Sequence, residues 1–199
     1  MLDTLSIALA LAAAAGLRAF AVIAVVGALG YFQILDLPPS MLAMTQPWVI
    51  LTASGFALIE IMADKTPGVD SAWDVLNTFV RIPAGAFLAQ GFGAEVLPDY
   101  AAAWMIGGGA VAATTHAMKT ASRALINTSP EPVSNWIASL IEDLSVTMLL
   151  VLVVVLPMAA MALAVLVLAV AVYLLPKVAR GFRALWRRLL SRPNHESVS

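Results

Sequence analysis

The sequence contains no cysteine among its 199 residues, and this absence removes several kinds of chemistry. Disulfide bonds, thiolate metal sites and cysteine nucleophiles all need the thiol group, so none of them is available to the chain. Charge is also scarce, because only 12% of the residues are Asp, Glu, Lys or Arg. A soluble domain carries about 25% charged residues, so this composition argues against an ordinary soluble domain.

Hydrophobic residues make up most of the chain instead. They account for 61% of the sequence, and the mean hydropathy is +0.92. Residues 5–15, 101–113 and 148–175 contain no charged residue, and a membrane-spanning helix needs about 20 mostly apolar residues. The composition therefore predicts an all-α integral membrane protein, and we expect it in a bacterial inner (plasma) membrane.

The order of hydrophobic runs and helix breakers predicts about six transmembrane helices. They are expected at residues 4–32, 48–64, 71–92, 102–125, 134–155 and 158–175, with Pro-containing segments between them. The first run is too long for one straight span, and Gly16 marks where it bends or starts. This division gives a helical bundle over residues 1–176 and a basic tail over residues 177–199.

The basic residues are unevenly distributed, and their distribution predicts the orientation. Six of the eleven lie beyond Pro176: Lys177, Arg180, Arg183, Arg187, Arg188 and Arg192. Basic residues near helix ends stay in the cytoplasm. With six spans, this rule predicts that the N-terminus and the C-terminus are both cytoplasmic.

The basic tail also carries Phe182, Leu185, Trp186 and Leu189 among its charges. This pattern is typical of an amphipathic helix that binds anionic lipids at the membrane surface. A plain topology anchor is the simpler interpretation, and we expect no nucleic acid partner. The expected partners are thus the lipid bilayer, anionic lipids at the tail and a small ion or solute, and an oligomer is compatible with the sequence.

Four of the expected spans carry polar stripes at helical spacing. The stripes comprise Glu60 and Asp64; Asp70, Asp74, Asn77 and Arg81; His116, Lys119, Thr120, Arg123 and Asn127; and Asn135, Ser139, Glu142, Asp143 and Thr147. Charged residues in a membrane are costly, so they usually face the bundle interior. We therefore expect these four helices to face one another, and we expect Arg18 of the first span to reach a carboxylate of the same cluster.

Two interpretations of this cluster remain open. Its six acidic and five basic residues nearly balance, which favours ion pairs that only hold the helices together. Glu60 and Glu142 lie well inside their spans, however, and the sequence favours them as a functional pair of buried carboxylates without full partners. The candidate ion- or substrate-binding residues are Arg18, Glu60, Asp64, Asp70, Asp74, Asn77, Arg81, His116, Lys119, Arg123, Glu142 and Asp143.

Catalytic and cofactor motifs are not recognised in the sequence. His116 has no second ligand at metal-binding spacing, so packing is favoured over metal binding or proton relay, and any metal stays unknown. Residues 107–109 are three glycines, but neither a preceding strand nor a following Gly-Lys-Ser/Thr makes them a phosphate loop. We therefore expect no enzyme activity and no cofactor.

Short internal matches suggest a 3+3 inverted repeat. Residues 58–60 and 140–142 both read Leu-Ile-Glu, and Arg-Ala occurs at residues 18–19 and 123–124. Residues 60–66 also show a fainter similarity to the Glu-x-Gly-Asp-Lys-Thr/Ser motif of small calcium and manganese exchangers. The chain has an extra residue between Glu60 and Asp64, alanine in place of glycine, and no second Asp-Lys pair.

The same polar motifs carry a broader resemblance. They are residues 16–20, Glu60, residues 63–67 with Asp70, residues 78–81 with Pro83 and Gly85, residues 116–119, and residues 142–143. In these motifs the chain resembles a bacterial family of small membrane proteins catalogued as domain of unknown function 4126. The resemblance implies a membrane location and no particular activity.

The leading functional hypothesis is a small transporter or channel-like protein. Carboxylate oxygens suit protons and hard cations, so Glu60, Asp64, Asp70, Asp74, Glu142 and Asp143 are expected to line a polar cavity that faces the cytoplasm. One alternative is the binding or translocation of an anionic lipid or phosphate-bearing substrate by the buried arginines and lysine. Another is a non-transporting membrane scaffold.

Overall fold

The protein forms a bundle of six long helices in a computed structural model that describes residues 1–66, 68–128 and 132–190. The long helices are α1 (Leu2–Tyr31), α2 (Pro47–Ala63), α3 (Val69–Val96), α4 (Ala101–Ile126), α5 (Pro132–Val155) and α6 (Pro157–Leu190). Two 3₁₀ helices connect them, η1 (Pro39–Thr45) and η2 (Pro98–Tyr100). Over the described ranges there is no strand, which confirms the expected all-α class.

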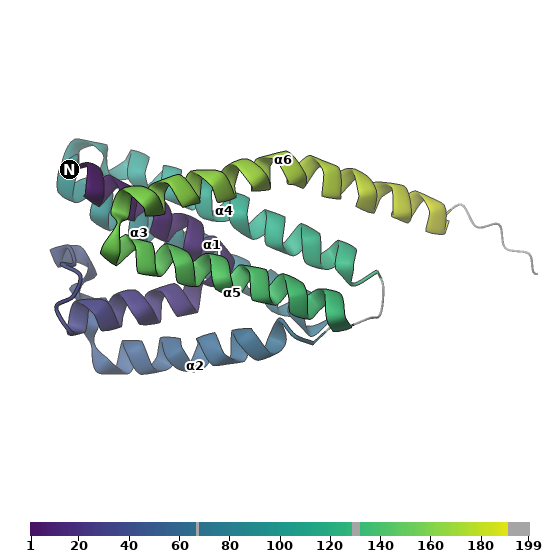
Figure 1. The fold of residues 1–199 in the computed structure, drawn as a ribbon, viewed down its shortest axis with the longest axis horizontal. Coiled ribbons are helices and arrows are strands. Elements are labelled where there is room, and N and C mark those ends of the chain that lie inside the picture. The colour runs from purple at the N-terminus through teal and green to yellow at the C-terminus, as the bar shows by residue number, and fades with distance from the viewer. Residues whose placement is uncertain (67, 129–131, 191–199) are drawn as a thin grey trace, which may run out of the picture.

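Helix α1 is folded back on itself. Its backbone leaves helical geometry at Arg18, where φ is −146° and ψ is 78°. A straight helix would separate Thr4 and Ile34 by about 45 Å, yet both residues line the same cavity at one end of the bundle. The helix is thus a hairpin with arms at residues 2–17 and 19–31, and Figure 1 shows both arms pointing to the end that carries the N-terminus.

This hairpin corrects the expected first span over residues 4–32. The bend expected near Gly16 is present, but it lies two residues later and reverses the chain. Each arm is shorter than the roughly 20 residues that a span needs. The pattern of hydropathy is the same for a straight helix and for a folded one, which is why the sequence alone predicted a single span.

The remaining long helices run between the two ends of the bundle (Figure 1). We call the end that holds Leu2 the N-terminal end, and the opposite end, where α2 meets α3, the charged end. The hairpin packs against each of the other five long helices, so it forms the centre of the fold. Helix α6 starts at the N-terminal end and continues through Pro176 beyond the charged end (Figure 1).

The expected basic tail is therefore continuous with α6 up to Leu190. Arg192 and the side chains of residues 184–190 lie outside the described part of the chain. Most large side chains of α6 are exposed, including Val165, Leu166 and Val172, as expected for a peripheral helix.

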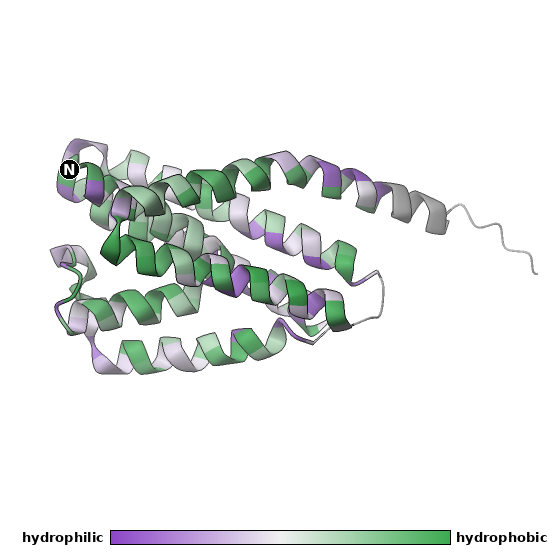
Figure 2. Ribbon diagram, in the orientation of Figure 1, coloured by the Kyte–Doolittle hydropathy of each residue, from purple (hydrophilic) through white to green (hydrophobic). Residues whose placement is uncertain are grey.

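The buried faces of the helices change from polar to apolar along the bundle. On α5, Asn135, Ser139 and Glu142 are buried near the charged end, whereas Val146, Leu149 and Val153 are buried toward the N-terminal end. Figure 2 shows the same change in the hydrophilic patches of α4 and α5. The bundle thus combines an apolar core around the α1 arms with a charged core beyond the hairpin tip.

Three of the described helices are long and apolar enough to cross a membrane, by length and composition. They are α5, α6 and α1, the last only if its two arms are counted as one helix, and η1 with α2 would form a fourth span across a bend of 69°. Helices α3 and α4 are not among them, because glycines and polar residues such as Asn77, Arg81 and His116 lower the hydropathy of their apolar stretches.

Candidate functional site

Arg18 at the hairpin tip joins two helices at the charged core. Its Nη2 atom lies 3.1 Å from Oδ2 of Asp64, and its Nε atom lies 2.5 Å from Oδ1 of Asp143. Nη2 also donates a hydrogen bond to Oγ of Ser139 at 3.1 Å. The expectation that Arg18 reaches a carboxylate of the polar cluster is therefore confirmed.

Arg81 forms the second centre of the charged core. Its Nη2 atom lies 2.5 Å from Oε1 of Glu60, and its Nη1 atom lies 2.7 Å from Oδ1 of Asp74. All three side chains are fully buried. Glu60 comes from α2, so this arginine ties α2 to α3 across the bundle.

Lys119 and Arg123 connect these centres to α5. Nζ of Lys119 lies 2.6 Å from Oδ2 of Asp64 and 3.2 Å from Oε2 of Glu142. Nη2 of Arg123 lies 2.9 Å from the same oxygen of Glu142, and its Nη1 atom donates to the backbone carbonyl of Asn135. We call Arg18, Glu60, Asp64, Asp74, Arg81, Lys119, Arg123, Glu142 and Asp143 the charged network.

The break in α1 is held by side chains of α4. Thr115 donates a hydrogen bond to the carbonyl of Ala13 at 3.1 Å, and Nζ of Lys119 lies 3.4 Å from the carbonyl of Leu17. A helix break leaves carbonyls without their usual partners, and such backbone is tolerated inside a membrane only where protein covers it. Thr115 was not among the predicted site residues, although it lies four residues before Lys119 on the same face.

His116 lies beside Arg81, and its hydrogen bonds define its tautomer. Arg81 can only donate, so Nδ1 of His116 accepts its hydrogen bond at 3.0 Å. Thr78 donates its hydroxyl hydrogen to the carbonyl of Asp74, so its oxygen is free to accept from Nε2 at 2.7 Å. The ring is therefore the neutral Nε2–H form and positions Arg81, and Thr78 is a second residue that the sequence pattern missed.

Asp70 and Asn77 lie on the α3 stripe but do not join the ion pairs. Oδ1 of Asp70 accepts hydrogen bonds from the backbone of Gly68 and Ser71 and from Nδ2 of Asn127. These contacts hold the start of α3 against the end of α4. Nδ2 of Asn77 is buried without a hydrogen-bond partner.

The prediction that Glu60 and Glu142 lack full partners is wrong for Glu142, whereas one oxygen of Glu60, Oε2, is buried without a partner. Glu60 pairs with Arg81, and Glu142 pairs with Lys119 and Arg123. Their depth in the bundle was predicted correctly, but the sequence could not show that the arginines of α3 and α4 point at them. Lys65 differs from the other predicted cluster bases, because its side chain is exposed.

Acidic groups outnumber basic groups in this core. The buried acids are Glu60, Asp64, Asp70, Asp74 and Glu142, and the buried bases are Arg18, Arg81, Lys119 and Arg123. Four carboxylate oxygens are buried without a hydrogen-bond donor: Glu60 Oε2, Asp64 Oδ1, Asp70 Oδ2 and Asp74 Oδ2. Buried polar atoms are nearly always paired with protein or water, so the core offers acceptor positions for protons or for bridging water.

Asp143 is the accessible member of the charged network. Its side chain is 32% exposed, whereas that of Glu142 is 11% exposed and the other members are 2% exposed or less. It lines a crevice of about 360 Å³ together with Lys65, Val133, Trp136, Ile137 and Leu140. The crevice leads from the surface of the charged end to the carboxylate that holds Arg18.

Within the described part of the chain, no three His, Asp or Glu side chains lie close enough to hold a metal ion. A hard cation needs several converging oxygens, whereas a proton needs one.

The comparisons with known proteins agree with the family resemblance. The family described as Domain of unknown function (DUF4126) matches residues 5–177. No curated protein and no solved structure matches the chain.

Proposed function

The chain belongs to this family of unknown function, and we propose from the site itself that it is a small transporter or channel-like membrane protein for protons or another small cation. The observation that carries the proposal is the excess of acids in the buried core. Five buried carboxylates lie among four buried bases, and four carboxylate oxygens have no donor. Uncompensated charge in a low-dielectric interior is costly, so binding a proton or cation would relieve it.

The hairpin supports this proposal independently. In many transporters, broken helices place backbone ends and charged groups at an ion site near the middle of the membrane. Here the break at Arg18 brings the hairpin tip to Asp64 and Asp143. We propose that a proton enters through the crevice at Asp143 and that Arg18 relays the change of charge to Asp64.

The arrangement of the ends leads to a revised topology. We propose a re-entrant α1 hairpin followed by five crossings, α2 to α6, with the charged end in the cytoplasm. The N-terminal end carries Asp3, Asp36, Glu95 and Asp99 and none of the lysines or arginines of the described helices and loops. This topology places the N-terminus outside and the C-terminus inside. A 3+3 inverted repeat would pair α1 with α4, although α1 is a hairpin and α4 is unbroken.

The experiment that tests the function measures proton and cation flux. The protein is reconstituted into liposomes that contain a pH-sensitive dye, and a pH gradient is applied with a panel of cations outside. We expect flux in wild type and its loss in Asp143→Asn, which removes the charge of the accessible carboxylate and keeps its shape. Asp99→Asn at the N-terminal end is the matched control and should retain flux, while absence of flux in wild type contradicts the proposal.

A structural scaffold is the second candidate function. The observation that favours it is the pairing of each buried base with at least one carboxylate. The same pairing argues against a phosphate-bearing substrate, because the guanidinium groups that would bind the phosphate already contact carboxylates. A scaffold predicts that Asp143→Asn and Glu60→Gln alter stability while wild type conducts nothing.

Under either function, the basic end of α6 is proposed to bind anionic lipids in the inner membrane.

A further inference from the structure

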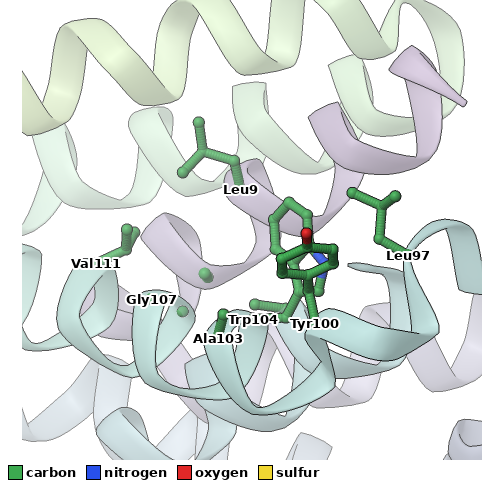
Figure 3. A pocket seen from close by; sticks show the side chains of 10 residues that line it. Leu9, Leu97, Tyr100, Ala103, Trp104, Gly107 and Val111 are labelled. Atoms are coloured by element: carbon green, nitrogen blue, oxygen red, sulfur yellow. The ribbon is translucent and has the colours of Figure 1, made fainter. Parts of the chain in front are cut away.

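Two hollows of the bundle differ in what their walls offer a ligand. The hollow between α1, α3 and α4, around Trp104, has a volume of about 360 Å³, and none of the described residues that line it is charged (Figure 3). The crevice between the end of α2 and the start of α5 is equally large, at about 360 Å³, but it is lined by Lys65 and Asp143, which carry opposite charges. Of the two, the crevice therefore has groups that can select an occupant.

Asp143 gives the crevice an acidic wall on α5. Its Oδ1 atom contacts Nε of Arg18, while its side chain stays 32% exposed, so the carboxylate can accept further hydrogen bonds from an occupant. Next to it, five buried carboxylates lie among four buried bases, so the core has no excess of positive charge that would repel a cation. This side of the crevice therefore favours an ammonium group, whose hydrogen bonds to a carboxylate are strengthened by charge.

Lys65 brings a positive charge to the crevice from the end of α2. Its side chain is exposed, and within the described ranges its ammonium group has no ion-pair partner. A lysine ammonium has three donors on a flexible stem and is a common ligand of phosphate oxygens. This side of the crevice therefore favours an anionic group such as a phosphate.

The other side chains of the crevice wall are apolar and suit a lipid. Val133, Ile137 and Leu140 lie on one face of α5, and each is more than half exposed. Trp136 is exposed beside them, and its Nε1 atom donates a hydrogen bond to the backbone carbonyl of Lys65 at 3.3 Å. Tryptophan concentrates at the boundary between lipid tails and water. The two charged groups thus lie at the depth of lipid headgroups, and the apolar face lies beside the acyl chains.

We propose that the crevice binds a zwitterionic phospholipid with a primary ammonium group, such as phosphatidylethanolamine. Its phosphate contacts Lys65, its ammonium group donates hydrogen bonds to Asp143, and one acyl chain lies along Val133, Ile137 and Leu140. Phosphatidylcholine has the same charges but no N–H group to donate. Phosphatidylglycerol has the phosphate but no ammonium group. Both should therefore bind the crevice more weakly.

This lipid site deepens the proposed function, because it names a partner at the crevice through which a proton is proposed to enter. It rests on that function for its role in transport, but the binding itself requires no ion flux. A measurement of lipid binding therefore tests the two proposals separately. A protein that conducts nothing can still select the lipid, and a conducting protein can fail to select it.

Native mass spectrometry of the full-length protein counts the bound lipids. The purified protein in detergent micelles is incubated with phosphatidylethanolamine and phosphatidylcholine of identical acyl chains at equal concentration. We expect wild type to retain several-fold more phosphatidylethanolamine, and an excess of phosphatidylglycerol should not displace it. Lys65→Gln and Asp143→Asn should each reduce this retention several-fold, because each removes one of the two charges that hold the headgroup.

Lys177→Gln and Asp99→Asn are the matched controls, because both side chains are exposed and lie outside the crevice. They should retain phosphatidylethanolamine like wild type, and thermal unfolding checks that every variant is folded. Lys65 lies outside the charged network, so Lys65→Gln keeps the test decisive if Asp143→Asn does not fold.

Three results would overturn the lipid site. They are equal retention of the two zwitterionic lipids by wild type, retention that Lys65→Gln leaves unchanged, and displacement by phosphatidylglycerol, which would mean that the crevice recognises only the phosphate. A dimer that forms in place of the lipid complex would overturn it as well, because a second chain would then cover the crevice.

Discussion

Nη2 of Arg18 lies 3.1 Å from Oδ2 of Asp64, and this contact joins the tip of a helical hairpin to the turn between α2 and α3. Both side chains are almost fully buried. The arginine also contacts Asp143 of α5, so one residue at a helix break holds two carboxylates from distant parts of the chain. A change in the charge of Asp64 or Asp143 should therefore alter how firmly the hairpin tip is held.

Removing Arg18 should strongly destabilise the fold. Arg18→Ala leaves Asp64 and Asp143 without this partner, and breaking a buried ion pair in this way costs about 3–5 kcal/mol. The free energy of unfolding in detergent micelles measures the effect. Arg183→Ala, at an exposed position of α6, should change it by less than about 0.5 kcal/mol, and equal stability of the two variants would contradict the importance of the hairpin tip.

The hairpin topology can be tested by cysteine labelling, because the natural chain has no cysteine. Single cysteines at Leu2, Ile34, Thr66 and Thr128 all lie at exposed positions. A membrane-impermeant maleimide should label Leu2→Cys and Ile34→Cys from one side and the other two from the opposite side. If Leu2→Cys and Thr128→Cys react from the same side, the hairpin with five crossings is wrong.

Gly16 should not tolerate even one additional methyl group. A Cβ atom there would collide with Oγ1 of Thr115 and with the carbonyl of Ala112, so Gly16→Ala should lower the free energy of unfolding by about 1–3 kcal/mol. Gly107→Ala is the matched control on α4, where a Cβ atom meets open space. That variant should gain about 0.5–1 kcal/mol, because alanine favours helix over glycine.

NMR spectroscopy can test the tautomer assigned to His116. Nitrogen-15 spectra at neutral pH should show a hydrogen on Nε2 and none on Nδ1, since Arg81 donates to Nδ1 and Thr78 accepts from Nε2. His195→Gln removes the other histidine signal. Arg81→Lys should disturb this spectrum, whereas a wild-type ring with both nitrogens protonated would contradict the assigned hydrogen bonds.

The sequence predicted the helices and the convergence of their polar faces. Hydropathy and prolines placed all six helical segments within a few residues, except that α6 continues to Leu190. The regular spacing of Asp70, Asp74, Asn77 and Arg81 correctly predicted one buried face. These features could be predicted because helical periodicity and the cost of burying charge are local properties.

The pairing within the charged core could not be predicted in the same way. Which base meets Glu60 or Glu142 depends on the rotation and separation of whole helices, and the sequence gives neither. Six acids and five bases allowed both paired and unpaired glutamates. The folded-back α1 also escaped prediction, since Arg18 within an apolar run was its only charged signal. Thr115 acts on a backbone carbonyl of α1, which has no signature in the sequence, and the contact of Thr78 with His116 depends on how α3 and α4 are rotated.

The hairpin has a consequence for biosynthesis. Arg18 leaves the ribosome early, but Asp143 follows only 125 residues later, a delay of about 6–25 s at typical synthesis rates. During this interval neither arm is long enough to span the bilayer, and the arginine lacks one of its two carboxylates. The first helix to be made should therefore be among the last to settle, and the nascent chain is expected to keep it near the membrane surface or the insertion machinery until α5 is in place.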